Sequence, residues 1–141
     1  GLLAERGVGV HGIDKDRGAG GNVTRWDLSA KFLPWEVWTP FDLVICREVL
    51  EHLTVLQIRQ AVTNLCNLTS RFVYATTRFC PFPSHLLSVA TADDLDPDHR
   101  SMLNVTFLRA LFVLEGFKRR ADLEDKLCWK NERPLLVYER A

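Results

Sequence analysis

A cluster of ionisable side chains follows the most apolar run of the sequence. The run is Leu43–Cys46, and the cluster behind it contains Arg47, Glu48, Glu51 and His52. A histidine is the natural candidate for a general base, because its ordinary pKa lies near neutrality. We therefore treat His52 and Glu51 as candidate catalytic residues. The alternative is that both side chains only cap and orient the helix that follows.

Two acidic residues occur at the ends of two other apolar segments. Asp14 follows Val8–Ile13, and Asp27 lies in Val23–Leu28. A carboxylate can accept hydrogen bonds from two neighbouring hydroxyl groups at once, which makes Asp14 a candidate binding residue. The alternative for each acid is a structural one, because aspartate at the end of a strand also caps turns.

These residues need strands and helices that bring them to one edge. The expected elements, in chain order, are the end of a helix at Gly1–Arg6, strands at Val8–Ile13, Val23–Leu28 and Phe41–Cys46, a helix from Thr54, a strand at Arg71–Thr77, a helix from Met102 or Val105 to Glu115, and strands at Phe117–Leu123 and Leu135–Glu139. This alternation predicts a single α/β domain over residues 1–141 with a mostly parallel sheet, whose ligands bind beyond the carboxyl ends of the strands.

The predicted strands differ in their burial and in the direction of their pairing. The unbroken apolar run Leu43–Cys46 is typical of a strand that is buried on both faces. The last two strands have no helix between them, so we expect an antiparallel pair at one edge of the sheet. The fold class is therefore α/β, with a mostly parallel sheet and an antiparallel C-terminal edge strand.

Charge and composition argue against several classes of function. The 141 residues include 18 basic and 18 acidic side chains, so the formal net charge is zero and there is no electrostatic footprint for nucleic acid. No apolar stretch approaches the ~20 residues of a membrane span, and the sequence does not begin with a signal peptide. The four cysteines form no C-x-x-C pair. We expect a cytoplasmic protein with reduced, mostly buried thiols and no nucleic-acid or membrane partner.

A long connection with three prolines is expected from Phe79 to Pro97, and loops of that length are often lids or binding segments. His85 and His99 flank its acidic part, which contains Asp93, Asp94, Asp96 and Asp98. A divalent cation needs about six ligands in a defined geometry, and no spacing here specifies them. We therefore expect a solvated loop and no metal site.

Four segments together resemble the class I S-adenosylmethionine-dependent methyltransferases, and the resemblance covers nearly the whole chain. They are Val10–Asp14, Trp26–Leu28, Phe41–Leu53 and Phe107–Phe117. The resemblance implies a Rossmann-like fold with S-adenosylmethionine as the cofactor. Asp14 would bind the ribose hydroxyls of that cofactor, and Asp27 would contact its adenine amine. The resemblance also places Leu28, Arg47 and Glu48 in the cofactor site.

The glycine-rich loop that follows the first strand of this family has no counterpart in the sequence. A G-x-G-x-x-G pattern starting at Gly7 leads into a strand instead of opening a helix, and Gly18–Gly21 follows the second strand. We therefore expect the sheet to lack its central first strand. Unpaired backbone groups cost on the order of 1–3 kcal/mol each if buried. Either Val8–Ile13 pairs directly with Phe41–Cys46, or another chain supplies the strand, or it lies in the protein outside this sequence.

The leading hypothesis is methyl transfer from S-adenosylmethionine to a small or medium-sized acceptor bound under residues 79–103. Because the loop that would hold the amino-acid part of the cofactor is missing, we expect this chain alone to bind the cofactor weakly or not at all. Two alternatives are a non-catalytic methyltransferase-like binding or structural module, and a nicotinamide-dependent Rossmann enzyme with the same acid after its second strand. An antiparallel final pair of strands favours the methyltransferase over the dehydrogenase.

Overall fold

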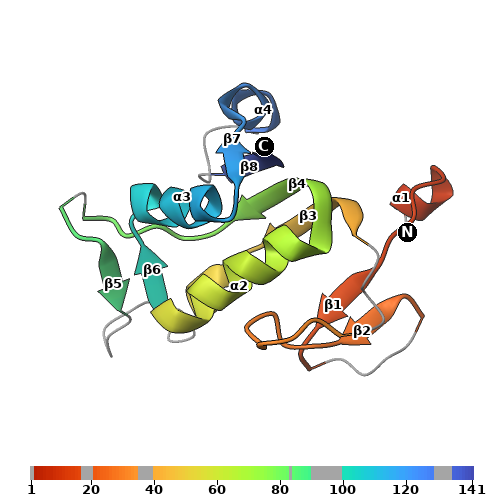
Figure 1. Ribbon diagram of the computed structural model, residues 1–141, viewed down its shortest axis with the longest axis horizontal. Helices are drawn as coiled ribbons and strands as arrows, with labels where there is room; N and C mark the ends of the chain where they lie inside the picture. The colour runs from red at the N-terminus through yellow and green to blue at the C-terminus, as the bar shows by residue number, and fades with distance from the viewer. Residues whose placement is uncertain (1, 17–20, 35–39, 83, 90–99, 129–134) are drawn as a thin grey trace.

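The computed structural model describes residues 2–16, 21–34, 40–82, 84–89, 100–128 and 135–141. In chain order, its elements are α1 (Leu2–Glu5), β1 (Gly12–Asp14), β2 (Val23–Arg25), β3 (Phe41–Arg47), the 3₁₀ helix η2 (Leu50–His52), α2 (Val55–Leu68), β4 (Thr69–Thr76), β5 (Leu87–Val89), β6 (Ser101–Leu103), α3 (Val105–Leu114), β7 (Phe117–Arg119), α4 (Ala121–Leu127) and β8 (Leu135–Arg140). Figure 1 shows a main body of sheet and helices with β1 and β2 at one side of it. The predicted mixed α/β architecture is confirmed.

The main sheet has four strands in the order β3, β4, β8, β7. β3 and β4 run parallel, with Val44 opposite Val73, whereas β8 is antiparallel to both of its neighbours. The antiparallel pairing of the last two strands is therefore as predicted. The position of the C-terminal strand differs from the prediction in one respect: β8 lies one place in from the edge, and β7 forms the edge itself.

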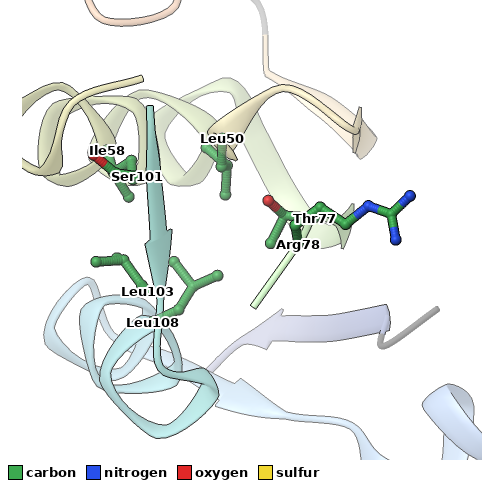
Figure 2. A pocket seen from close by; sticks show the side chains of 7 residues that line it. All are labelled: Leu50, Ile58, Thr77, Arg78, Ser101, Leu103 and Leu108. Carbon is green, nitrogen blue, oxygen red and sulfur yellow. The ribbon is translucent and has the colours of Figure 1, made fainter. Parts of the chain in front are cut away.

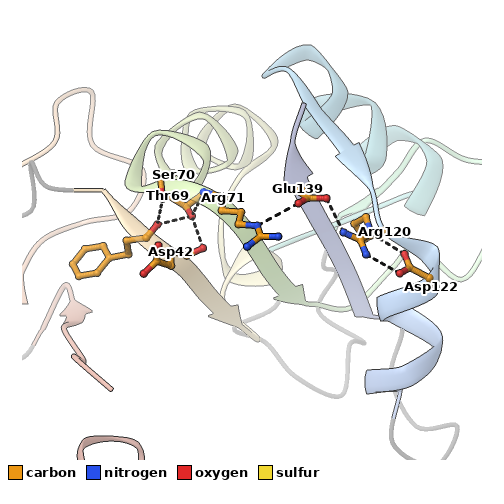
Figure 3. Close-up of polar contacts among 8 residues, drawn as sticks. Asp42, Thr69, Ser70, Arg71, Arg120, Asp122 and Glu139 are labelled. Carbon is orange, nitrogen blue, oxygen red and sulfur yellow. Dashed lines mark hydrogen bonds and ion pairs between the residues drawn. The ribbon is translucent and has the colours of Figure 1, made fainter. Parts of the chain in front are cut away.

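The start of β3 is fixed by a hydroxyl group from β4. The register of the two strands shifts between Phe41 and Leu43. At this shift the buried Oγ1 of Thr69 donates to the carbonyl oxygen of Phe41 at 2.8 Å, and it lies 3.3 Å from that of Asp42 (Figure 3). From Leu43 onward the pairing is regular as far as Arg47, so the irregularity stays away from the carboxyl end of the strand.

Both long helices begin at side-chain caps. At the start of α2, the backbone N–H of Gln57 donates to Thr54 Oγ1 at 3.4 Å, and the N–H of Thr54 donates to Gln57 Oε1 at 2.9 Å. At the start of α3, Asn104 Oδ1 accepts from the N–H of Thr106 at 2.9 Å. Gly116, with φ 80°, follows the end of α3. None of the helices in the described ranges is long and apolar enough to cross a membrane.

The hydrophobic core lies between these two helices and one face of the main sheet. Its fully buried members include Ile58, Val62, Leu65, Val73, Ala75, Leu108, Phe112 and Tyr138. Phe112 of α3 stacks on Tyr138 of β8 with 4.7 Å between the ring centroids. Because apolar burial is the main favourable term in folding, this layer holds β3 and β4 in place for the site at their carboxyl ends.

The opposite face of β3 is open, contrary to the expectation that this strand is buried on both faces. Leu43 and Ile45 are 48% and 56% exposed, whereas Cys46, on the helix side, is 4% exposed. Side chains alternate between the faces of a strand, so only every second residue reaches the core. No segment within the described ranges covers the other half.

The predicted strand Phe117–Leu123 is shorter than expected, because the chain turns into α4 after Arg119. Arg120 stabilises this turn. Its guanidinium Nη2 lies 2.8 Å from Asp122 Oδ2, and its Nη1 lies 2.7 Å from Glu139 Oε2 on β8 (Figure 3). The loop expected from Glu124 onward is helical as far as Leu127, and residues 129–134 lie outside the described ranges.

The long connection before α3 contains two short strands that the sequence analysis did not predict. β5 pairs antiparallel with β6, and α3 begins at Val105, directly after Asn104. Ser101 and Leu103 of β6 are buried and pack against Leu50 of η2 and Leu108 of α3, leaving no room for a water molecule (Figure 2). The C-terminal end of this connection is thus part of the packed structure. Residues 90–99, and with them His99 and the four aspartates, lie outside the described ranges.

β1 and β2 form a separate parallel sheet in which Gly12 lies opposite Val23 and Asp14 opposite Arg25. The first of the three arrangements considered for the missing strand is therefore wrong, because β1 pairs with β2 and not with β3. The reason is geometric: Val8–Val10 contributes no ladder pairs, and the strand consists only of Gly12–Asp14. The other two arrangements involve residues outside this sequence and remain predictions.

Candidate functional site

A large open cavity lies between the small sheet and β3, with a volume of about 1080 Å³. It brings together six of the seven site residues predicted from the sequence, which are Asp14, Asp27, Leu28, Arg47, Glu48 and His52. They come from the ends of β1, β2 and β3 and from η2. The seventh residue, Glu51, is 1% exposed and lies in the protein interior.

Asp14 is the last residue of β1 and is partly buried. Its Oδ1 accepts a hydrogen bond from the backbone N–H of Asp16 at 2.8 Å, and its carbonyl oxygen accepts from the N–H of Trp26 at 3.0 Å. Asp14 therefore caps the turn after β1, as the structural alternative supposes, and also lines the cavity. The two roles are compatible because the two oxygens of a carboxylate can together accept about four hydrogen bonds.

Asp27 also holds a turn, two residues beyond β2. Its Oδ1 accepts from the backbone N–H of Ser29 at 2.8 Å and from the Ser29 hydroxyl at 2.7 Å. These two hydrogen bonds lower the pKa of Asp27 below its usual value, because they favour the charged form. Asp27 thus presents a negative charge at the cavity wall at neutral pH.

The end of β3 bends sharply at Glu48. This residue has φ 55°, a left-handed conformation that is uncommon for residues other than glycine. Its backbone N–H donates to the carbonyl oxygen of Thr76 at 2.9 Å, which continues the pairing of β3 with β4 by one bond. Strained backbone of this kind is often found at functional sites. Val49 and His52, which follow Glu48, line the cavity.

Glu51 and His52 are neighbours in η2 but face opposite ways. Glu51 Oε2 accepts from the hydroxyl of Thr77 at 2.7 Å. Burial, and then a hydrogen bond with Glu48, raises the pKa of the Glu51 carboxyl. His52 is exposed and lines the cavity. Of the two predicted catalytic residues, only His52 is placed to contact a ligand there.

Asn64 is a polar residue of the site region that the sequence analysis missed. It lies on the buried face of α2, is 2% exposed, and donates to two carbonyl groups of the loop that holds Asp27. Position 64 does not belong to the helical repeat Val55, Ile58, Val62, Leu65, so no local pattern marks it as buried. A buried amide needs hydrogen-bond partners, so it marks a place where another segment approaches.

Neither the buried thiols nor the acids in the described part of the chain form a second reactive site. Burial raises the pKa of the Cys46 thiol to about 12, with a further contribution from Glu51, so this thiol stays protonated. Cys66 is buried as expected, whereas Cys80 is partly exposed and Cys128 exposed, so only half of the four are buried. Within the described residues, no three His, Cys, Asp or Glu side chains are grouped to hold a metal ion.

Comparison with known proteins gives information on the fold. No family model matches the sequence, and no curated protein matches it. The N-terminal domain of EvdMO1 with S-adenosylhomocysteine bound aligns with a TM-score of 0.58 and 15% identity, over 85% of this chain and 53% of that one. Magnesium protoporphyrin IX methyltransferase from Synechocystis, also with S-adenosylhomocysteine, gives 0.54 and 19%, over 87% and 53%. The chain has the class I methyltransferase fold.

The similar structures include a protein with a different description, and this chain aligns with only part of the length of each. A protein described as a putative zinc-dependent alcohol dehydrogenase from Rhodobacter sphaeroides aligns with a TM-score of 0.55 and 13% identity, over 84% of this chain and 65% of that one. The chain spans about half the length of the first methyltransferase structures that it matches. At these identities the likeness is one of fold. The methyltransferase fold accounts for the parallel strands followed by the antiparallel pair β8 and β7.

Proposed function

We propose that the protein takes part in methyl transfer from S-adenosylmethionine to a small or medium-sized acceptor, with the cofactor in the cavity between β1 and β3. The observation that supports this most is that one cavity gathers Asp14, Asp27 and Glu48 from the ends of three different strands. Acids after successive strands, at the carboxyl edge of an α/β sheet, suit a ligand with several hydroxyl and amine donors.

The residues present fit the nucleoside part of the cofactor. The ionised carboxylate of Asp27 would accept from the adenine amine, and Leu28 next to it would contact the ring. Asp14 would accept from the ribose hydroxyls. The bound cofactor supplies a methyl group on a positively charged sulfur, and the residues of this chain align the acceptor and handle its proton.

His52 would take the proton of the acceptor, since it is exposed on the cavity wall. Glu51 would act from behind the cavity wall. It accepts a hydrogen bond from Thr77 at the end of β4, and its proximity to Glu48 contributes to the rise of its pKa. Arg47, which is exposed at the carboxyl end of β3 and lines the cavity, would contact the acceptor or the carboxylate of the cofactor.

A second candidate is a non-catalytic methyltransferase-like module. The observation that favours it is that β1 and β3 belong to separate sheets, with the open cavity between them. No segment in the described ranges stands where a loop would hold the amino-acid part of the cofactor. Such a module would keep the cavity and the fold but would not bind the cofactor tightly.

Substitution of Asp14 tests the proposal. Asp14→Ala in the full-length protein should weaken S-adenosylhomocysteine binding by roughly 1–3 kcal/mol, the scale for losing hydrogen bonds to a charged group. Isothermal titration calorimetry measures this directly. Asp125→Ala, on the exposed side of α4, is the matched control and should leave the affinity unchanged.

An equal affinity for Asp14→Ala and the unsubstituted protein would remove Asp14 from the site. Absence of binding by the unsubstituted protein would instead favour the non-catalytic module.

A further inference from the structure

Asn64 makes a bridge between α2 and the loop after β2. Its Nδ2 lies 2.7 Å from the carbonyl oxygen of Leu28 and 2.8 Å from that of Ala30. Its Oδ1 accepts from Gln60 Nε2 at 3.2 Å. The two hydrogens of one amide therefore reach two carbonyl groups of the same loop, 34 and 36 residues earlier in the chain.

Burial of the Asn64 amide costs free energy unless its donors and its acceptor have hydrogen-bond partners. Asn64 is 2% exposed, and a buried amide without partners would destabilise the fold. Any displacement of the loop would break both hydrogen bonds at once. The geometry of the amide thus favours a single position of the loop relative to the main sheet.

The loop in question contains the acid that lines the cavity. Asp27 lies immediately before Leu28, and its turn is closed by the N–H of Ala30, which donates to the Asp27 carbonyl at 2.9 Å. The β2 strand that leads into it has three residues and pairs only with β1 within the described ranges. So short a strand does little to fix the position of the loop. The hydrogen bonds from Asn64 on α2 fix it instead.

We propose that Asn64 is a positioning residue for ligand recognition: it sets the place of Asp27 and Leu28 against β3 and thereby the preference of the cavity for adenine over other bases. This inference rests on the proposed function, since it concerns the nucleoside end of the same site. Asn64 touches neither ligand nor reacting atoms. Its effect passes through the two carbonyl groups that it holds.

The first part of the test needs no ligand. Asn64→Leu removes both donors at nearly constant volume, so exchange of the Ala30 and Ser29 amide hydrogens should become about tenfold faster or more. Exchange in β3 should stay unchanged. Asn67→Leu, at an exposed position of the same helix, is the matched control and should alter neither. Unchanged exchange at Ala30 in Asn64→Leu would overturn the proposal.

The second part uses two ligands that differ only in the base, S-adenosylhomocysteine and S-inosylhomocysteine, which lacks the adenine amine. The full-length protein should prefer the adenosyl compound. Asn64→Leu should reduce that preference about tenfold, because Asp27 no longer meets the amine, and should change the affinity for the inosyl compound about twofold at most. Asn67→Leu should leave both affinities unchanged.

An equal loss of affinity for both ligands in Asn64→Leu would show a merely structural role and overturn the proposal. If Asn64→Leu does not fold, Asn64→Ser, which keeps one donor, should give smaller changes in the same direction, and no change in the preference would overturn the proposal equally. If the unsubstituted protein binds neither ligand, the proposed function fails and takes the base preference with it. The exchange rate at Ala30 then still decides whether Asn64 holds the loop.

Discussion

Glu51 is an acid held inside the protein, and its contribution to stability should depend on pH in the direction opposite to that of most acids. Burial and the hydrogen bond with Glu48 raise its pKa, so the folded state keeps a proton that the unfolded state loses. The stability due to this group is complete below the unfolded pKa of about 4.3 and is lost as the pH rises through the folded value.

Urea denaturation of Glu51→Gln at several pH values tests this sign. We expect the free energy of unfolding of the variant to rise relative to that of the unsubstituted protein as the pH rises from about 4 to 8. Glu115→Gln is the matched control. Burial of Glu115 acts to raise its pKa, but hydrogen bonds from Arg59 and Thr63 outweigh it and lower the value. The free energy of unfolding of that variant should therefore fall relative to that of the unsubstituted protein as the pH rises towards the unfolded pKa of about 4.3, and should not rise relative to it at higher pH. Equal slopes for the two variants would contradict the assignment.

The residues of the site illustrate what can be read from a sequence. Acids at strand ends were predictable, because strand periodicity locates the ends and parallel strands end at one edge. The inward direction of Glu51 was not, since it depends on the bend at Glu48 and on a 3₁₀ turn. Asn64 was missed because its partners lie more than 30 residues away, in a loop whose position no local pattern specifies.

At the scale of elements, the capping box of α2 should have a measurable effect. Thr54→Ala removes the hydroxyl that accepts from Gln57, and it should lower the free energy of unfolding by about 1 kcal/mol. Thr106→Ala, at an exposed position in the first turn of α3, should change it by less than about 0.5 kcal/mol. Both are measured by urea denaturation, and equal effects would show that the cap contributes little.

The long helices and the strands with apolar runs were predictable, and the two short strands of the connection before α3 were not. β5 and β6 have three residues each, too few for a period of two to be recognised. The start of α4 was predicted as the end of a strand and its remainder as a loop. This happened because the start of α4 is stabilised by Arg120, Asp122 and Glu139, and Glu139 lies on a distant strand. Tertiary contacts of this kind override local propensity.

At the scale of the whole molecule, the open face of β3 calls for an explanation. Strands of parallel sheets are usually buried on both faces, and Ile45 is 56% exposed here. We expect this face to be covered in the full-length protein. Ile45→Lys should then lower the free energy of unfolding by more than about 2 kcal/mol, because a charge would be buried.

Leu56→Lys is the control for that measurement, since Leu56 is 81% exposed on α2 and its replacement should cost less than about 0.5 kcal/mol. Chemical denaturation of both variants decides. Small effects at both positions would mean that the face of β3 remains in water.

The separation of β1 from β3 by the open cavity has a corresponding consequence for ligand binding. A strand from another chain or from elsewhere in the protein would join the two sheets and add a loop at the cavity. We therefore expect the 141-residue chain alone to bind S-adenosylmethionine weakly or not at all. Calorimetry that gave micromolar binding to this chain would show that the cavity needs no further strand.

The most direct test of the account is a calorimetric titration of the full-length protein with S-adenosylhomocysteine and, separately, with NADH. Both ligands contain an adenosine, but the methyltransferase account predicts micromolar or tighter binding of the first and no heat from the second. Binding of NADH without S-adenosylhomocysteine would assign the cavity to a dehydrogenase. Binding of neither would contradict the central claim that the cavity between β1 and β3 is a cofactor site.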